Sequence, residues 1–159
     1  MVAATLLDEF DAMEDWAERY EFLIDLGRRA PALSDDLKTE ANRVRGCQST
    51  VYMAPSLKPG TLDVIEFKAD SDSELVKGLL ALLHLLFSGH RAEDVLAFDL
   101  PRFLEMAGLN SNLTTGRRNG LAEMIKRLQG FAAGCQVANS TIDPRHSSPA
   151  QQTIAGRPA

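Results

Sequence analysis

The order of apolar and polar positions along the chain predicts helices around a short hairpin. Apolar residues of 13–27 recur at the spacing of one helix face, and 5–13 forms a shorter helix before it. Strand-like runs at 42–54 and 61–69 flank a turn over 55–60. Further helical patterns lie at 72–87, 92–97, 101–107 and 114–134. The expected fold class is therefore α+β, with a small antiparallel β-sheet packed against helices.

Several residues mark where these elements begin and end. The helix over 72–87 is apolar around most of its surface, which is typical of a helix at the centre of a fold. Ser71 and Glu74 have capping-box spacing at its start. Gly27 and Gly134 are expected to close the helices that precede them. Residues 136–159 contain no aromatic residue, so we expect a folded domain over 1–135 and a disordered C-terminal tail over 136–159.

The charge distribution excludes some classes of function. The chain has 159 residues, enough for one domain, and a formal net charge of −5. That balance argues against a nucleic-acid binder, whose surface must be basic. Residues 1–20 are strongly acidic, unlike a targeting peptide, and no apolar run is long enough to span a membrane. We therefore expect a cytoplasmic protein. The acidic segment is either a solvated helix face or a docking surface for a basic partner, and both readings stay open.

Metal and cofactor signatures are absent from the sequence. The chain has two cysteines and three histidines, and no two of them share a ligand-type spacing. The sequence also lacks the glycine-rich motifs that bind nucleotides. We therefore expect neither a metal nor a cofactor, and the remaining chemistry falls to the thiols. The candidates weighed for a metal site are Cys47, His84, His90, Cys135 and His146.

Cys47 is the cysteine whose neighbours indicate chemistry. Gly46 precedes it between two strand-like runs, which suits a sharp exposed loop. In an extended chain, Arg43, Arg45 and Cys47 project to the same side. Guanidinium groups near a thiol lower its pKa and favour the reactive thiolate. The alternative is a small buried side chain without a chemical role.

The sequence around Cys47 resembles a known family. The segment NRVRGCQSTVY is similar to the active-site loop of the SufE family, the sulfur-acceptor partners of cysteine desulfurases. The segment ADSDSELVKGLLALL resembles the start of that family's central helix. The segment FDLPRFLEMAGLNSNLTTGRRNGLAEMIKRL resembles its C-terminal half. The three blocks occur in the family's order across 16–129, and the family's α+β fold, which resembles iron–sulfur scaffold proteins of the IscU type, agrees with the pattern above.

The resemblance implies a sulfur-transfer function. Cys47 is expected to accept persulfide sulfur from a pyridoxal-phosphate-dependent cysteine desulfurase of the SufS or CsdA kind, to stimulate it, and to deliver sulfur to an iron–sulfur scaffold. The cofactor belongs to the partner, and the chain acts as a non-enzymatic partner in the transfer. Whether the chain forms a homodimer stays an open question. The supporting residues expected around Cys47 are Arg43, Arg45, Gly46, Gln48, Ser49 and Arg117.

Two positions depart from the family's pattern. Tyr52 stands where tryptophan is common, which keeps an aromatic ring. Gly116 stands where serine is usual, and the change removes a helix cap that Thr114 or Thr115 can supply instead. The resemblance places Arg117 near the cysteine loop.

Two rival functions use the same thiol. A cysteine hydrolase pairs Cys47 with His84 or His90 and with Asn119, and it needs a histidine within hydrogen-bond reach of the sulfur. A redox sensor uses Cys135 as a resolving thiol. We interpret His84 as a structural histidine of the core. We also expect the loop to tuck Cys47 inward in the free protein, because an exposed thiolate invites oxidation.

Overall fold

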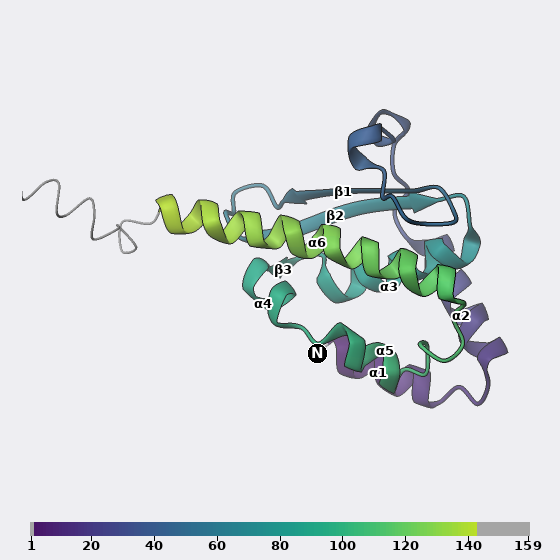
Figure 1. The fold of residues 1–159 in the computed structure, drawn as a ribbon. Coiled ribbons are helices and arrows are strands. Elements are labelled where there is room, and N and C mark those ends of the chain that lie inside the picture. The colour runs from purple at the N-terminus through teal and green to yellow at the C-terminus, as the bar shows by residue number, and fades with distance from the viewer. Residues whose placement is uncertain (1, 143–159) are drawn as a thin grey trace, which may run out of the picture.

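The computed structural model describes residues 2–142 and shows helices packed against one small sheet (Figure 1). This confirms the α+β class. The elements are α1 (Val2–Asp11), α2 (Trp16–Arg29), the 3₁₀ turns η1 (Asp35–Leu37) and η2 (Glu40–Asn42), β1 (Val51–Leu57), β2 (Val64–Ser71), α3 (Glu74–Phe87), β3 (His90–Arg91), α4 (Ala92–Ala97), α5 (Leu100–Met106) and α6 (Thr115–Ile142).

The sheet is antiparallel with the strand order β1-β2-β3. Its inward positions alternate along the strands, as the period of two requires, and Met53 and Phe67 are buried on that face. The predicted turn at 55–60 begins too early, because β1 continues through Pro55, which pairs with Phe67. Proline lacks an N–H donor but is tolerated here because β1 is an edge strand.

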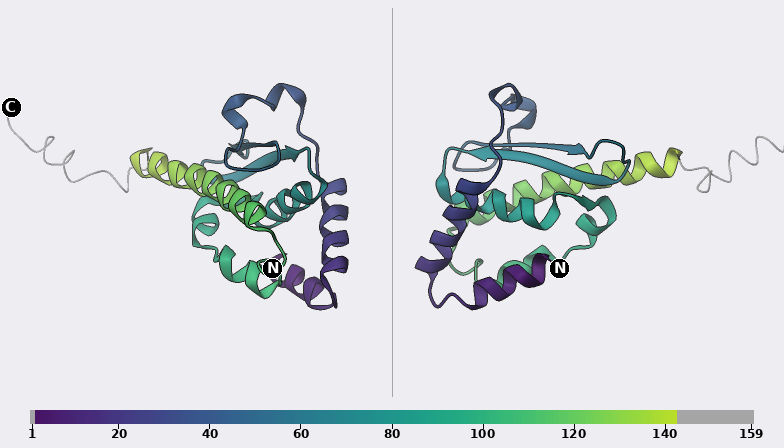
Figure 2. Two further views of the ribbon diagram at one scale, coloured as in Figure 1. Left: turned by 45° about the vertical axis from the view of Figure 1, so that its right-hand side comes forward. Right: turned by 180° about the vertical axis from the view of Figure 1, so that it is seen from behind.

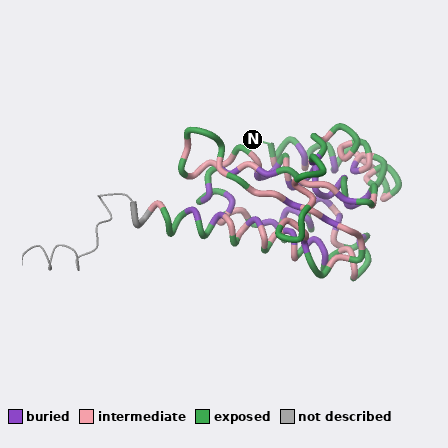
Figure 3. Tube along the Cα trace, turned by 90° about the horizontal axis from the view of Figure 1, so that it is seen from above, coloured by how far each residue is buried: buried purple, intermediate pink, exposed green. Residues whose placement is uncertain are grey.

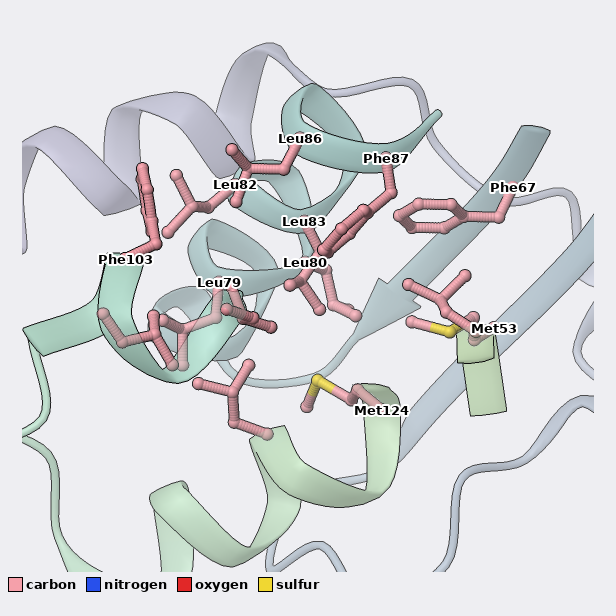
Figure 4. Close-up of a cluster of buried hydrophobic side chains, with 14 of the residues drawn as sticks. Met53, Phe67, Leu79, Leu80, Leu82, Leu83, Leu86, Phe87, Phe103 and Met124 are labelled. Atoms are coloured by element: carbon pink, nitrogen blue, oxygen red, sulfur yellow. The ribbon is translucent and has the colours of Figure 1, made fainter. Parts of the chain in front are cut away.

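Helix α3 forms the centre of the core, as its apolar sequence predicts. Leu79, Leu82 and Leu83 are buried within it, and Figure 4 shows their side chains meeting those of the sheet, α5 and α6. A Cβ added at Gly78 would stand 2.2 Å from the Leu23 carbonyl oxygen of α2. Glycine therefore allows the backbones of α2 and α3 to touch.

The predicted end of α2 and the predicted cap of α3 are wrong. Gly27 does not end α2, which continues to Arg29, and a Cβ at Gly27 would stand 2.8 Å from the Gly78 nitrogen. Gly27 thus allows the backbones of α2 and α3 to lie close together. Ser71 does not cap α3, because pairing with Val51 keeps Ser71 in β2. Ser73 is the cap instead, and its hydroxyl accepts a hydrogen bond from the Val76 nitrogen at 3.4 Å.

Helix α6 is longer than the sequence pattern predicts. Thr114 Oγ1 accepts a hydrogen bond from the Arg117 nitrogen at 3.2 Å, which confirms the expected substitute cap. The helix passes Gly134 and continues to Ile142, and Asn139 Nδ2 donates to the Leu62 carbonyl at 2.8 Å. Residues 136–142 are therefore helical and not part of a disordered tail. The rest of the expected tail, 143–159, lies outside the described residues.

The segments that lie outside the core are found on opposite sides of the molecule. The η1–η2 segment lies beyond the sheet, while α1 and α5 lie on the opposite side of the molecule (Figure 2). Buried positions concentrate where the helices meet the sheet, and residues 136–139 of α6 are mostly exposed (Figure 3). Within residues 2–142 no helix combines the length and apolarity needed to cross a membrane.

Candidate functional site

Cys47 lies in a closed loop between η2 and β1. The Val44 nitrogen donates to the Val51 carbonyl at 2.9 Å, which joins the two ends of the loop. Gly46 has a φ of 85°, a left-handed conformation that favours glycine. The predicted sharp loop at Gly46 is therefore present, and the chain is not extended there, which is the condition on which the alternation of Arg43, Arg45 and Cys47 depended.

The loop packs against one face of α6. A Cβ added at Gly120 would stand 3.2 Å from Cys47 Sγ, and one at Gly116 would stand 2.4 Å from Cδ of Gln48. Glu123 continues the same face, since its Cγ would lie 3.1 Å from a Cβ at Gly46. The two helix glycines thus provide the space that the loop occupies. Sequence reasoning missed this face, although two glycines four apart inside a helix are a signal of close approach.

The thiol of Cys47 is held in a partly buried position. It donates a hydrogen bond to the Gly120 carbonyl, with Sγ 3.7 Å from the oxygen. Burial raises the pKa of the Cys47 thiol, and the negative charge of Glu123 raises it further. The tucked geometry therefore favours the neutral thiol.

The arginines nearest in sequence do not stabilise a thiolate in this arrangement. Arg45 Nη2 lies 2.7 Å from Glu40 Oε2, and Arg43 Nη1 lies 3.8 Å from Glu40 Oε1. The turn at Gly46 breaks the alternation that would have placed both guanidinium groups beside the sulfur. The expectation of a lowered pKa for Cys47 is therefore wrong for the tucked loop.

Arg117 connects the end of the loop to α3. Its Nη1 donates to Ser49 Oγ at 3.1 Å and to Ser73 Oγ at 3.0 Å. Ser73 is also the cap of α3, so one guanidinium group joins the cysteine loop, α3 and α6. The structure thus brings Arg117 and Ser49 together beside Cys47, and leaves Gln48 exposed over Gly116.

A second arginine of α6, which the sequence analysis did not identify, holds the start of the loop. Arg127 Nη2 donates to the carbonyl of Ala41, and its Nη1 donates to that of Arg43 at 3.5 Å. Arg127 follows Glu123 by one helical turn on the same face of α6. Both ends of the cysteine loop are therefore attached to α6 by arginines.

Neither histidine considered as a catalytic base contacts the thiol. The ring of His84 packs edge-on against Phe67 with centroids 5.4 Å apart, and burial lowers its pKa while Glu66 acts in the opposite direction. His90 Nδ1 lies 3.2 Å from the Ser88 carbonyl. Cys135 is buried in the core cluster, farther along α6. In the part of the chain that the structure describes, no cluster of histidine, cysteine or carboxylate side chains could hold a metal ion.

Comparisons with known proteins identify a family and relatives of this chain. Residues 4–132 match the family model described as SufE, the Fe-S metabolism associated domain. An uncharacterized SufE-like protein of Rhizobium etli is 34% identical over 125 residues, which are 78% of this chain and 84% of that protein. A second one, from Rhizobium meliloti, is 32% identical over 130 residues, which are 81% of this chain and 93% of that protein.

The fold also matches a solved structure. The solution structure of a hypothetical protein from Thermus thermophilus superimposes with a TM-score of 0.70 at 21% identity, covering 86% of this chain and 96% of the other. At that identity the match supports the fold alone. The family model spans most of the chain and includes both the cysteine loop and the face of α6 that receives it. The chain therefore belongs to the SufE family of the Fe-S metabolism associated domain.

Proposed function

We propose that this protein is a sulfur acceptor that takes persulfide sulfur from a partner cysteine desulfurase onto Cys47, stimulates the partner, and delivers the sulfur to iron–sulfur cluster assembly. The observation that carries the proposal is the loop itself. Cys47 stands at its middle, and the loop is attached to α6 at both ends by arginines. We assign the activity to the cytoplasm, where free thiols such as Cys47 and Cys135 stay reduced.

The transfer step needs only a thiolate and a persulfide. The Cys47 thiolate attacks the outer sulfur of the partner's persulfide. The sulfur–sulfur bond in the partner breaks, a new one forms at Cys47 Sγ, and the partner's cysteine leaves as a thiolate. No external oxidant or reductant is needed. The proton that Cys47 gives up ends on the partner's thiolate or in water.

The tucked loop represents a resting state in this proposal. The Cys47 thiol donates to the Gly120 carbonyl and faces the charge of Glu123, so it is a poor nucleophile there. To reach another protein, the loop must leave the face of α6. That movement removes both causes of the raised pKa, because it exposes the sulfur and separates it from Glu123. When the partner releases the loop, the Cys47 thiol can therefore reach the partner's persulfide and also becomes a better nucleophile.

The rival functions have less support in the geometry. A cysteine hydrolase needs a base within hydrogen-bond reach of the sulfur. In residues 2–142 the Cys47 thiol bonds to a backbone carbonyl, and both histidines have other neighbours. The redox-sensor reading needs Cys135 close to Cys47, and the length of α6 between them opposes it.

The test is sulfur acceptance by single-cysteine variants. Each variant is incubated with a purified cysteine desulfurase and free cysteine, and intact mass is measured before and after reduction. Cys47→Ser should keep the fold but gain no reducible sulfur and give no stimulation of the desulfurase. The matched control, Cys135→Ser, should behave like the unmodified chain. Labelling of Cys135 with stimulation preserved in Cys47→Ser would overturn the assignment.

A further inference from the structure

The surface beside the cysteine loop is a charged hollow. It has a volume of about 450 Å³ and lies between the loop and α6. Four cations and two carboxylates line it, namely Arg43, Arg45, Lys126, Arg127, Glu40 and Glu123. We refer to these six side chains as the basic collar. Its formal charge is +2, in a chain whose formal net charge is −5.

We infer that the basic collar is a docking surface for an acidic protein surface, the carboxylate-rich rim around the sulfur-donor site of the partner desulfurase. The inference rests on the proposed function and adds to it the charge of the surface that the partner must present. The collar adjoins the Cys47 loop, because Arg45 belongs to that loop and Glu123 Cγ would lie 3.1 Å from a Cβ at Gly46. A partner that approaches the closed loop therefore meets the collar before the loop leaves α6.

The ion pairs inside the collar are able to exchange partners. The side chains of Arg45 and Glu40 are 76% and 69% exposed, and that of Lys126 is 71% exposed in its pair with Glu123. Such exposed pairs contribute little to stability, so their cations can turn to new carboxylates at low cost. Arg127 has a different role, since it is occupied by the loop's backbone carbonyls.

The rest of the molecule strengthens the orientation that the collar favours. Residues 1–20 hold six acidic residues against one arginine, and most of them lie in α1 and at the start of α2. Helix α1 lies across the molecule from the η1–η2 segment that precedes the loop (Figure 2). An acidic partner surface therefore attracts the collar and repels the opposite end. Such complementarity mainly raises the rate of encounter and orients it.

The collar fits carboxylates on a protein better than the phosphates of nucleic acid. Glu40 and Glu123 stand among its cations and would repel a continuous phosphate backbone. A separated set of carboxylates can instead approach Arg45 and Lys126 individually. The net charge of the chain also opposes general binding to nucleic acid.

The test measures association rates with a desulfurase that the unmodified chain has been shown to stimulate, over a series of salt concentrations. Arg45→Glu and Lys126→Glu should each slow association by about tenfold at low salt. Glu40→Gln should speed it, because it adds to the positive charge of the collar. All rates should converge as salt rises. Arg102→Glu, an exposed charge reversal on α5, is the matched control and should change the rate far less.

The outcomes separate this inference from the proposed function. If the chain accepts sulfur but its association rate does not depend on salt, the collar is not a docking surface. The same conclusion follows if all four variants associate at equal rates. Either result leaves the sulfur-acceptor function in place. Failure of the unmodified chain to accept sulfur at all would overturn the proposed function itself. Circular dichroism melting of each variant checks that the fold is retained. Competition by DNA at physiological salt would contradict the preference for a protein surface.

Discussion

At the scale of single residues, the site depends on two positions of α6 that have no side chain. Gly116 and Gly120 have no side chain to fill the space that Gln48 and Cys47 occupy. Glycine inside a helix costs about 1 kcal/mol relative to alanine. The space for the loop is therefore obtained at some expense to the stability of the helix, which is typical of a functional position.

The first prediction concerns Gly120. In Gly120→Ala the new methyl group would stand 3.2 Å from Cys47 Sγ and 3.5 Å from its Cβ, so the loop must shift outward. We expect the closed loop to lose about 1 kcal/mol relative to open forms, the net worth of one hydrogen bond. Alkylation of Cys47 by iodoacetamide should then accelerate about fivefold at constant pH. Peptide-resolved mass spectrometry separates Cys47 from Cys135.

Gly134→Ala is the control for that variant. No atom lies within 4 Å of a Cβ at Gly134, so this change has only the helix-propensity effect. It should stabilise the protein by about 1 kcal/mol and leave Cys47 reactivity unchanged. Equal alkylation rates in Gly120→Ala and Gly134→Ala would show that Gly120 does not hold the thiol in place.

The second prediction concerns Glu123. Glu123→Gln removes the negative charge that raises the pKa of Cys47, but burial, the larger cause, remains. The midpoint of Cys47 alkylation against pH should therefore move to lower pH, while staying above the usual value for a free thiol. Glu105→Gln on α5 is a carboxylate control. A midpoint that does not move would show that the Glu123 charge does not reach the sulfur.

The raised pKa also has a consequence for stability. The folded state holds the proton of Cys47 more tightly than the unfolded chain does. The contribution to the free energy of unfolding is therefore complete below the ordinary thiol pKa of 9.0 and decreases as pH rises through the folded value. Glu123→Gln should weaken this alkaline loss. Denaturant titrations at neutral and alkaline pH measure it.

At the scale of elements, sequence patterns predicted the long apolar helix α3, the hairpin and the cap at Thr114. They failed where a tertiary contact overrode a local signal. Pro55 remained within β1 because that strand is at the edge of the sheet, and Gly27 served helix contact and not helix termination. Helix α6 continued past Gly134, where its end is joined to the hairpin through Asn139. Such contacts involve distant segments, so no local pattern contains them.

The third prediction belongs to the contact between α2 and α3. In Gly78→Ala the new Cβ would lie 2.2 Å from the Leu23 carbonyl oxygen and 2.5 Å from its carbon, and a packed backbone cannot move aside easily. We expect a loss of about 3 kcal/mol or more in the free energy of unfolding. Gly130→Ala, with no atom within 4 Å, should instead gain about 1 kcal/mol. A stable Gly78→Ala protein would show that the two helices separate readily.

At the scale of the whole molecule, the site joins segments far apart in the chain. Cys47 meets Gly120, and Ala41 meets Arg127. The family resemblance identified Cys47 and the neighbourhood of Arg117, but the pairing of Arg43 and Arg45 with Glu40 could not be read from alternation along a strand. Burial and the charge of Glu123 raise the pKa of the Cys47 thiol, whereas the two arginines were expected to lower it. The sequence thus singled out the candidate thiol, but it did not predict the burial and the carboxylate that act on it.

The last prediction concerns the two cysteines together. Helix α6 rises about 1.5 Å per residue, so Cys135 lies roughly 22 Å along its axis from Gly120, the residue that contacts Cys47. A disulfide needs Cα atoms within about 7 Å. Mild oxidation of the monomer should therefore give no intramolecular disulfide, and the intact mass should show no loss of two hydrogens. The contrary result is a loss of two hydrogens that disappears in both Cys47→Ser and Cys135→Ser. It would mean that the fold opens widely enough to join the two cysteines. The redox-sensor reading would then replace sulfur transfer as the better account of Cys47.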